Sequence, residues 1–122
     1  PIDIVENVCN GVDIFDCVSP TRLARHGHAL TRYGKINIKN AKYKSDFTPI
    51  EEGCTCYACQ NYTKAYIKHL INCEETFGAR LLSIHNIHYL INLTEELRTA
   101  IKNDSLLAYR EEFIKNYYGE NK

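Results

Sequence analysis

The chain has 122 residues, of which 44% are hydrophobic, and its fifteen Lys and Arg residues balance fifteen Asp and Glu residues. This length allows one compact core, and no apolar run approaches the roughly 20 residues that a membrane-spanning helix needs. The first residues lack the basic and apolar blocks of a secretory signal, so we expect a soluble, cytoplasmic protein.

The first part of the chain predicts a short helix, a buried strand and a hairpin. Asp3 to Asn10 has apolar residues at helical spacing, with an Asp to cap its start. Val12 to Val18 is apolar and β-branched, which is typical of a strand buried on both faces of a parallel sheet. Alternation from Ala29 to Ile38 predicts a β-hairpin with Gly34 in its turn.

A basic segment follows the predicted strand, beginning with an expected loop from Pro20 to Arg25. Between Thr21 and Ser45 there are seven Lys or Arg residues and no Asp or Glu, although the formal net charge of the whole chain is +0. A local excess of positive charge attracts nucleic acid regardless of the total. The pattern therefore favours a nucleic-acid partner over a solvated basic hairpin.

Asp16 stands at the carboxyl end of the predicted strand. Catalytic groups of α/β barrels occupy this position. Taken alone, the residue is equally well explained as a cap or as the ionic partner of Arg22.

The remaining sequence predicts helices. The first runs from Tyr62 to Cys73, and Gly78 is expected to break the helical pattern after it. The second runs from Leu81 to Ile101, and the third from Ser105 to Tyr118. The chain then has two parts, with the strand, loop and basic hairpin in residues 1–45 and a metal-binding subdomain with carboxy-terminal helices in residues 46–122.

Three cysteines, Cys54, Cys56 and Cys59, lie within six residues. Such close thiols pair poorly with one another but converge readily on one Zn²⁺, so the spacing favours a metal over disulfides. The fourth ligand must come from elsewhere, and the candidates are His69, His85, His88 and Cys73.

Helical spacing favours His85 among these candidates. His85 shares the inward stripe of the second helix with Leu82 and Tyr89, and an antiparallel return past Gly78 would bring it to the cysteines. Four protein ligands saturate zinc, so we expect a structural ion that does not activate water.

Four ordered motifs resemble the carboxy-terminal part of the tRNA-guanine transglycosylases, also called queuine tRNA-ribosyltransferases. They are the run from Gly11 to Gly27, the run from Ile38 to Tyr43, the Cys-x-Cys-x-x-Cys motif, and Ser83 to Asn86. The resemblance covers nearly the whole chain. It implies an α/β fold, namely the carboxy-terminal part of a TIM (β/α)8 barrel with a zinc-binding helical subdomain, and thus a fragment of a longer protein.

The resemblance also implies roles for individual residues. Asp16 matches the nucleophilic aspartate of the family. The residues matching the loop that recognises the wobble guanine and its neighbours are Thr21, Arg22, Leu23, Ala24 and Arg25. The residues matching the zinc ligands are Cys54, Cys56, Cys59 and His85.

The implied activity is exchange of the wobble guanine of GUN-anticodon tRNAs for a 7-deazaguanine base, here 7-aminomethyl-7-deazaguanine, in queuosine biosynthesis. The family's proton-shuttling aspartate and base pocket belong to earlier barrel strands, so we expect the 122 residues not to exchange bases alone. The resemblance further implies a homodimer formed through the zinc subdomain, with Tyr62, Tyr66 and His69 either at the interface or in an ordinary core. The alternative function is a non-catalytic, zinc-stabilised RNA-binding module.

Overall fold

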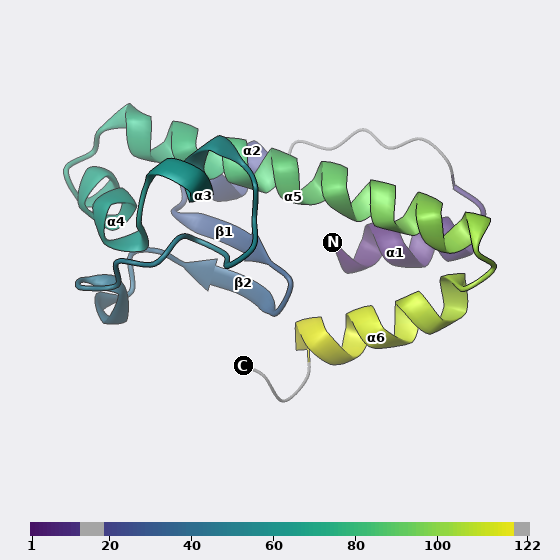
Figure 1. Cartoon of the computed structure of the whole chain (residues 1–122). Coiled ribbons are helices and arrows are strands. Elements are labelled where there is room, and N and C mark those ends of the chain that lie inside the picture. The colour runs from purple at the N-terminus through teal and green to yellow at the C-terminus, as the bar shows by residue number, and fades with distance from the viewer. Residues whose placement is uncertain (13–18, 119–122) are drawn as a thin grey trace. The chain divides into compact units, whose positions relative to one another are not determined.

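The computed structural model describes residues 1–12 and 19–118 (Figure 1). Its contacts divide the chain into two compact units, which we name the hairpin unit and the helical unit. The hairpin unit comprises Val18–Thr31 and Lys35–Tyr89, and the helical unit comprises Pro1–Cys17, Arg32–Gly34 and Leu90–Lys122. The predicted strand falls almost entirely on residues 13–18, and with Asp16 it lies outside the described residues.

The hairpin unit is built on two short strands. Helix α2 (Ser19–Arg25) precedes β1 (His28–Thr31) and β2 (Gly34–Asn37), and the 3-10 helix η1 (Ala41–Tyr43) follows. The strands form a two-stranded sheet, which confirms the predicted hairpin. Gly34 has a φ of +119°, a conformation that residues with a Cβ rarely adopt.

The segment expected as a basic loop is instead helix α2, which contacts β1. Pro20 suits the first turn of a helix, because its missing N–H has no partner to lose there. Pro20 and Ala24 are buried, while Arg22 and Arg25 are exposed. Burial of one helical face against the strand thus outweighs the loop tendency of the Pro-containing sequence.

The helix predicted from Tyr62 to Cys73 is confirmed as α4 (Lys64–Asn72), and it is preceded by a short helix that was not predicted, α3 (Tyr57–Asn61). Thr63 separates them, because its backbone is extended and its hydroxyl accepts a hydrogen bond from the backbone N–H of Tyr66 at 3.2 Å. This contact is an N-cap, which starts a new helix at Lys64.

Gly78 does not interrupt a helix, contrary to the sequence-based expectation. It lies inside α5 (Thr76–Lys102), and the break comes earlier, where Glu74 has a φ of +57°. A Cβ on Gly78 would lie 2.9 Å from the Cβ of Leu70 in α4. The glycine therefore permits a close approach of α4 and α5, and it does not mark a helix end.

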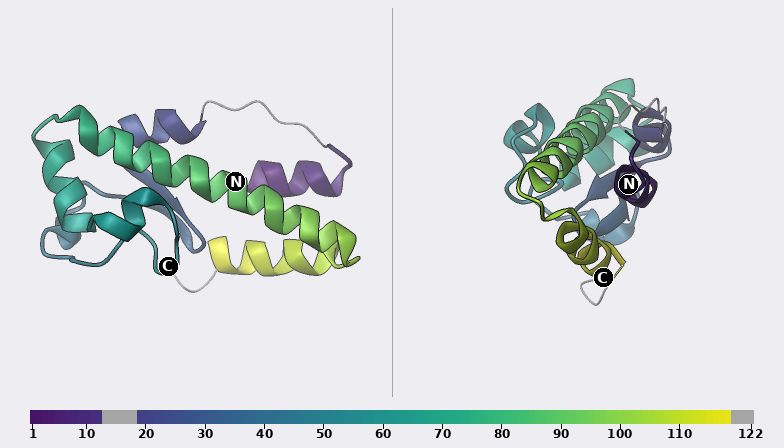
Figure 2. Two further views of the ribbon diagram at one scale, coloured as in Figure 1. Left: turned by 45° about the horizontal axis from the view of Figure 1, so that its top comes forward. Right: turned by 90° about the vertical axis from the view of Figure 1, so that its right-hand side faces the viewer.

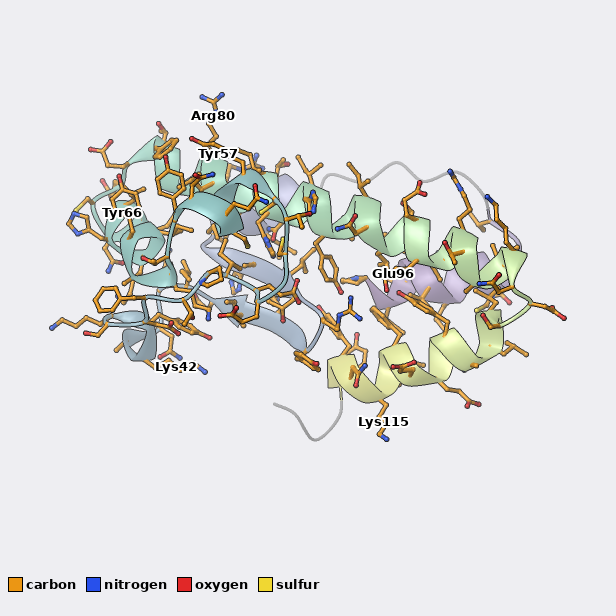
Figure 3. The ribbon with its side chains drawn as sticks, viewed as in Figure 1. Lys42, Tyr57, Tyr66, Arg80, Glu96 and Lys115 are labelled. Atoms are coloured by element: carbon orange, nitrogen blue, oxygen red, sulfur yellow. The ribbon has the colours of Figure 1, made fainter. Side chains whose placement is uncertain are left out.

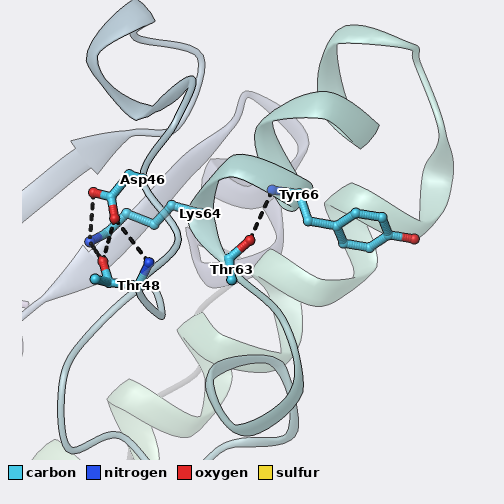
Figure 4. A network of polar contacts seen from close by, with 5 residues as sticks. All are labelled: Asp46, Thr48, Thr63, Lys64 and Tyr66. Atoms are coloured by element: carbon cyan, nitrogen blue, oxygen red, sulfur yellow. Dashed lines mark hydrogen bonds and ion pairs between the residues drawn. The ribbon is translucent and has the colours of Figure 1, made fainter.

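A polar network ties the loop before the cysteines to the start of α4 (Figure 4). The carboxylate of Asp46 accepts hydrogen bonds from the amide and the hydroxyl of Thr48, and it pairs with Lys64 at 3.4 Å. Backbone bonds of 2.9 Å run from Lys64 N–H to the Thr48 carbonyl and from Ala65 N–H to the Asp46 carbonyl. The loop is thus fixed to the helix by both its main chain and its side chains.

The core of the hairpin unit draws on every one of its elements. Leu81 and Leu82 of α5 are fully buried, as is Ile67 of α4. The same cluster includes Cys56 and Cys59, so two of the three motif cysteines belong to the packed interior. Metal ligands and apolar core therefore share one site.

The helical unit contains α1 (Ile2–Cys9), the second half of α5 and α6 (Leu106–Tyr118). Helix α6 runs back along that half of α5 (Figures 1 and 2), and a 3.4 Å bond from the Tyr109 hydroxyl to Glu96 links them. Arg110 Nε lies 2.6 Å from Glu6 Oε1 and joins α6 to α1. The helices predicted from Leu81 to Ile101 and from Ser105 to Tyr118 are confirmed as parts of α5 and α6.

The first helix begins differently from the prediction. Its N-cap is Pro1, with no side-chain hydrogen bond, so the expectation that Asp3 caps it is wrong. Asp3 lies in the first turn, where a carboxylate faces the partial positive charge of the helix start.

The described residues form a mixed α/β structure that is mostly helical with a small sheet. Among them, no helix is both long enough and apolar enough to span a membrane. The division at residue 45 and the barrel strand remain predictions.

Replacing Asp46 by Asn should destabilise the hairpin unit by about 1 kcal/mol at neutral pH, the scale of a hydrogen bond to a charged group in a half-exposed site. The Thr48 hydroxyl is the largest influence that lowers the pKa of Asp46. Because folding lowers this pKa, the contribution is present above about pH 4 and is lost as acid protonates the folded carboxylate. Urea unfolding of the zinc-loaded chain measures it.

The matched control is Glu52→Gln, which removes the same charge from an exposed position in the same loop region. It should change the unfolding free energy by less than about 0.5 kcal/mol. Equal effects of the two substitutions would show that the network around Asp46 does not stabilise the unit.

Candidate metal centre

The three motif cysteines reach the site from one tight turn. Cys54 precedes α3, Cys56 is its N-cap and Cys59 lies within it. The Cys56 sulfur accepts a hydrogen bond from the Cys59 backbone N–H at 3.3 Å. The turn that begins α3 therefore gathers the three thiols on one side.

His85 supplies a ring nitrogen to the same point from α5. Its Nδ1 lies 3.6 Å from the sulfur of Cys54, 3.7 Å from that of Cys56 and 3.4 Å from that of Cys59. Sulfur and nitrogen ligands of a tetrahedral zinc ion, at about 2.3 and 2.05 Å from the metal, lie about 3.6 Å apart. All four ligand atoms lie within 4.8 Å of one another, so their spacing matches a zinc tetrahedron.

The second ring nitrogen of His85 is fixed by the sheet. His85 is fully buried, and its Nε2 lies 2.7 Å from the backbone carbonyl of Leu30 in β1. A carbonyl only accepts, so Nε2 carries the hydrogen and Nδ1 keeps its lone pair for a metal. Such an outer contact orients a metal-binding histidine and sets its tautomer.

The pKa values in the cluster show how strongly the ligands interact. Burial acts to lower the pKa of His85, but contacts with the sulfurs of Cys54 and Cys56 and with the Leu30 carbonyl outweigh it and raise the pKa to about 10. A hydrogen bond from the Cys59 thiol lowers the pKa of Cys56 to about 3, and the same bond together with burial raises the pKa of Cys59. Metal binding must displace protons from His85 and Cys59, so affinity for the metal rises with pH.

These residues fit one structural zinc ion, which confirms the predicted ligands Cys54, Cys56, Cys59 and His85. Three thiolates and one imidazole complete the tetrahedron and leave no position for water or substrate. The ion would join α3 to α5 at the centre of the hairpin unit's core.

The other candidates for the fourth ligand have different partners. His88 Nε2 lies 3.2 Å from the Thr55 hydroxyl. The ring of His69 lies 3.8 Å from the sulfur of Cys73, and both residues are exposed. The choice of His85 from helical spacing is therefore correct.

The predicted RNA-contacting residues occupy α2 and differ in exposure. Arg22 and Arg25 are exposed, Thr21 and Leu23 are half-buried, and Ala24 is fully buried in the core. The two arginines are therefore the charged side chains of α2 and are both accessible to a partner.

Asn86 has a structural role that its local sequence does not predict. This fully buried side chain donates from Nδ2 to the carbonyls of Pro20 and His28, each at 3.0 Å, and its Oδ1 accepts from Leu30 N–H at 2.9 Å. Its partners are backbone groups more than 50 residues away, which no local pattern indicates. The only local indication in the sequence is that Asn86 is a second polar residue, directly after His85, between the apolar residues Ile84 and Ile87.

Comparison with known proteins identifies relatives across the whole chain. A family model described as "Queuine tRNA-ribosyltransferase" matches residues 1–119. Proteins of the same description are similar to the chain: that of Macrococcus caseolyticus is 55% identical over 117 residues, that of Listeria welshimeri 54% over 117, and that of Streptococcus mutans 52% over 122. These alignments cover 96%, 96% and 99% of the chain but only 31%, 31% and 32% of the relatives, so the chain spans about a third of their length.

Replacing His85 by Ala should weaken zinc binding by more than about a hundredfold, the upper end of the loss seen when only an outer-shell partner is removed. Competition with a chromophoric chelator at pH 7.5 measures the affinity. His88→Ala is the matched control, since His88 lies on the same helix and contacts Thr55 rather than the cluster. Similar losses in the two variants would contradict the assignment of His85 as the ligand.

Proposed function

The chain belongs to the queuine tRNA-ribosyltransferase family, and from this we propose that it is the carboxy-terminal part of an enzyme that exchanges a tRNA base. The base removed is the wobble guanine of GUN-anticodon tRNAs, and the base inserted is a 7-deazaguanine, in queuosine biosynthesis. The observation that carries this proposal is the match over residues 1–119, which contains the metal centre and the Asp16 motif together.

Asp16 is the proposed nucleophile. Its carboxylate attacks the ribose C1′ as the bond from C1′ to guanine N9 breaks, which gives an aspartyl–ribosyl ester and releases guanine as N9 takes up a proton. The incoming base then gives up its N9 proton and attacks C1′ through N9, the ester bond breaks, and the carboxylate is regenerated, so one proton is taken up and one released over the two steps. Two inversions at C1′ retain its configuration.

Exposed arginines on α2 support the proposed RNA recognition. Arg22 and Arg25 can hydrogen-bond phosphates or base edges once the target nucleotide leaves its stack. Buried Ala24 would act by seating α2 on the core, and Thr21 and Leu23 would contribute at its edge.

The charges near β1 are consistent with a polyanionic partner. Burial lowers the pKa of His28, and the positive charges of Lys35, His26 and Lys39 lower it further. The region around the hairpin therefore carries a positive field, which draws in the RNA backbone.

The incoming base is proposed to be 7-aminomethyl-7-deazaguanine. Support comes from two tracts that resemble bacterial members of the family, Asn40 to Asp46 and Phe77 to Arg80. Part of the first tract forms η1 and part of it the Asp46 network.

A homodimer through the hairpin unit is proposed from an aromatic cluster on α3 and α4. Tyr62 stacks on Tyr66 with ring centroids 5.5 Å apart and meets the edge of Tyr57 at 5.8 Å. Tyr57 and Tyr66 are 54% and 43% exposed, and Figure 3 labels both side chains. Clustered, exposed tyrosines of this kind supply much of the binding energy at protein interfaces.

A zinc-stabilised RNA-binding module without catalysis is the alternative. Its metal centre would be the same saturated site, which offers no open position for chemistry. In that case Asp16 is structural, and its replacement leaves base exchange by the longer protein unchanged.

The decisive test joins this chain to the amino-terminal two thirds of the Macrococcus caseolyticus relative and replaces Asp16 by Asn. Exchange of radiolabelled guanine into tRNA should fall by a factor on the order of a thousand or more, with tRNA binding retained, because a nucleophile is lost while the surface is kept. Asp13→Asn, in the same motif, is the matched control. Unchanged exchange in the Asp16→Asn chimera would favour the RNA-binding module.

Replacing Tyr66 by Ala should weaken self-association of the chain about tenfold or more, as expected for a central aromatic residue of an interface. Sedimentation equilibrium measures the dimer dissociation constant. Leu107→Ala, at a 70% exposed position of α6, is the control and should leave it unchanged. A wild-type chain that stays monomeric at high concentration would rule out this interface.

A further inference from the structure

One buried side chain, that of Asn86, bonds the start of α2. Asn86 Nδ2 bonds the carbonyl of Pro20, in the first turn of α2, and the carbonyl of His28, where β1 begins. Asn86 Oδ1 bonds the N–H of Leu30, also in β1. One amide therefore links helix α5 to both ends of the segment that contains Arg22 and Arg25.

Helix α2 depends on such contacts. It has seven residues, and isolated helices of fewer than about 12 residues are marginal in water. Its buried residues are only Pro20 and Ala24. The hydrogen bond from Asn86 adds a directional constraint that apolar packing does not supply, because it fixes the rotation of the first turn and hence the direction in which the arginines point.

Asn86 shows no other role among the described residues of the hairpin unit. Its side-chain oxygen and nitrogen both bond backbone groups, and it is not one of the four residues that could bind the metal. Its neighbour His85 bonds the carbonyl of Leu30 while Asn86 bonds the N–H of the same residue. Leu30 of β1 therefore bonds both a metal ligand, His85, and the residue that holds α2, Asn86.

We propose that Asn86 is a positioning residue for RNA recognition: its amide holds α2 in the orientation in which Arg22 and Arg25 meet the anticodon loop. This inference rests on the proposed function of α2. It assigns the residue no contact with RNA.

Asn86→Asp is the sharpest substitution. The side chain keeps its shape and the oxygen that faces Leu30 N–H, but an oxygen replaces the nitrogen that faces the carbonyls of Pro20 and His28. Asn92→Asp is the matched control, since it adds the same negative charge at an exposed position six residues further along α5. Both variants therefore add one negative charge to the same helix, and only Asn86→Asp removes the donor to Pro20 and His28.

Fluorescence anisotropy gives the dissociation constant of the zinc-loaded chain for a GUN-containing anticodon stem–loop. We expect Asn86→Asp to weaken binding about tenfold or more, because the carbonyls of Pro20 and His28 lose this donor. Asn92→Asp should weaken it less than about threefold, and each variant should still bind one zinc ion. Equal affinities of the two variants would overturn the proposal.

Arg22→Ala and Arg25→Ala distinguish a failure of the proposed role of Asn86 from a failure of the proposed RNA site on α2. If they weaken RNA binding while Asn86→Asp behaves like Asn92→Asp, the role of Asn86 is wrong and the proposed RNA site stands. If neither arginine variant weakens binding, the proposed RNA site itself is wrong.

A measurement on the unaltered chain covers the case in which Asn86→Asp does not fold. Because the Asn86 side chain is fully buried and its amide nitrogen bonds two backbone carbonyls, its side-chain amide protons should exchange with solvent far more slowly than those of Asn92. Exchange at similar rates in the zinc-loaded chain would overturn the proposal without any variant.

Discussion

Convergence of three sulfurs and one imidazole nitrogen on a single point is the constraint on which the hairpin unit depends. The cysteines come from the turn that begins α3, and the imidazole comes from α5, so the ion closes a loop of about 30 residues through α4. Cys56 and Cys59 also belong to the apolar core. Loss of the metal would leave thiols and a histidine buried without their common partner, which a small core tolerates poorly.

Two adjacent residues extend this constraint from the metal to the sheet and to α2. His85 Nε2 bonds the Leu30 carbonyl at 2.7 Å, and Asn86 bonds the Leu30 N–H at 2.9 Å. The side chains of His85 and Asn86 are fully buried, so a polar group that lost its hydrogen bond there would carry the full cost of its desolvation. We therefore expect these bonds to form together or not at all. A site with no chemistry of its own can in this way shape the surface that carries Arg22 and Arg25.

The sequence predicted the features that rest on local chemistry. Close cysteine spacing indicated the metal, helical periodicity selected His85, and alternation around Gly34 indicated the hairpin. It failed where distant contacts decide: burial of Pro20 and Ala24 turned an expected loop into α2, and the close approach of Leu70 explains a glycine that had been interpreted as a helix break. Asn86 could not be assigned beforehand, since all its partners are backbone groups brought together only by the fold.

Zinc K-edge X-ray absorption on the zinc-loaded chain tests the central claim most directly. The account predicts three sulfur neighbours at about 2.3 Å and one nitrogen at about 2.0–2.1 Å, with no water oxygen in the shell. A shell of two or fewer sulfurs, or an added oxygen ligand, would contradict it, because the ion would then neither be saturated nor join α3 to α5 as described.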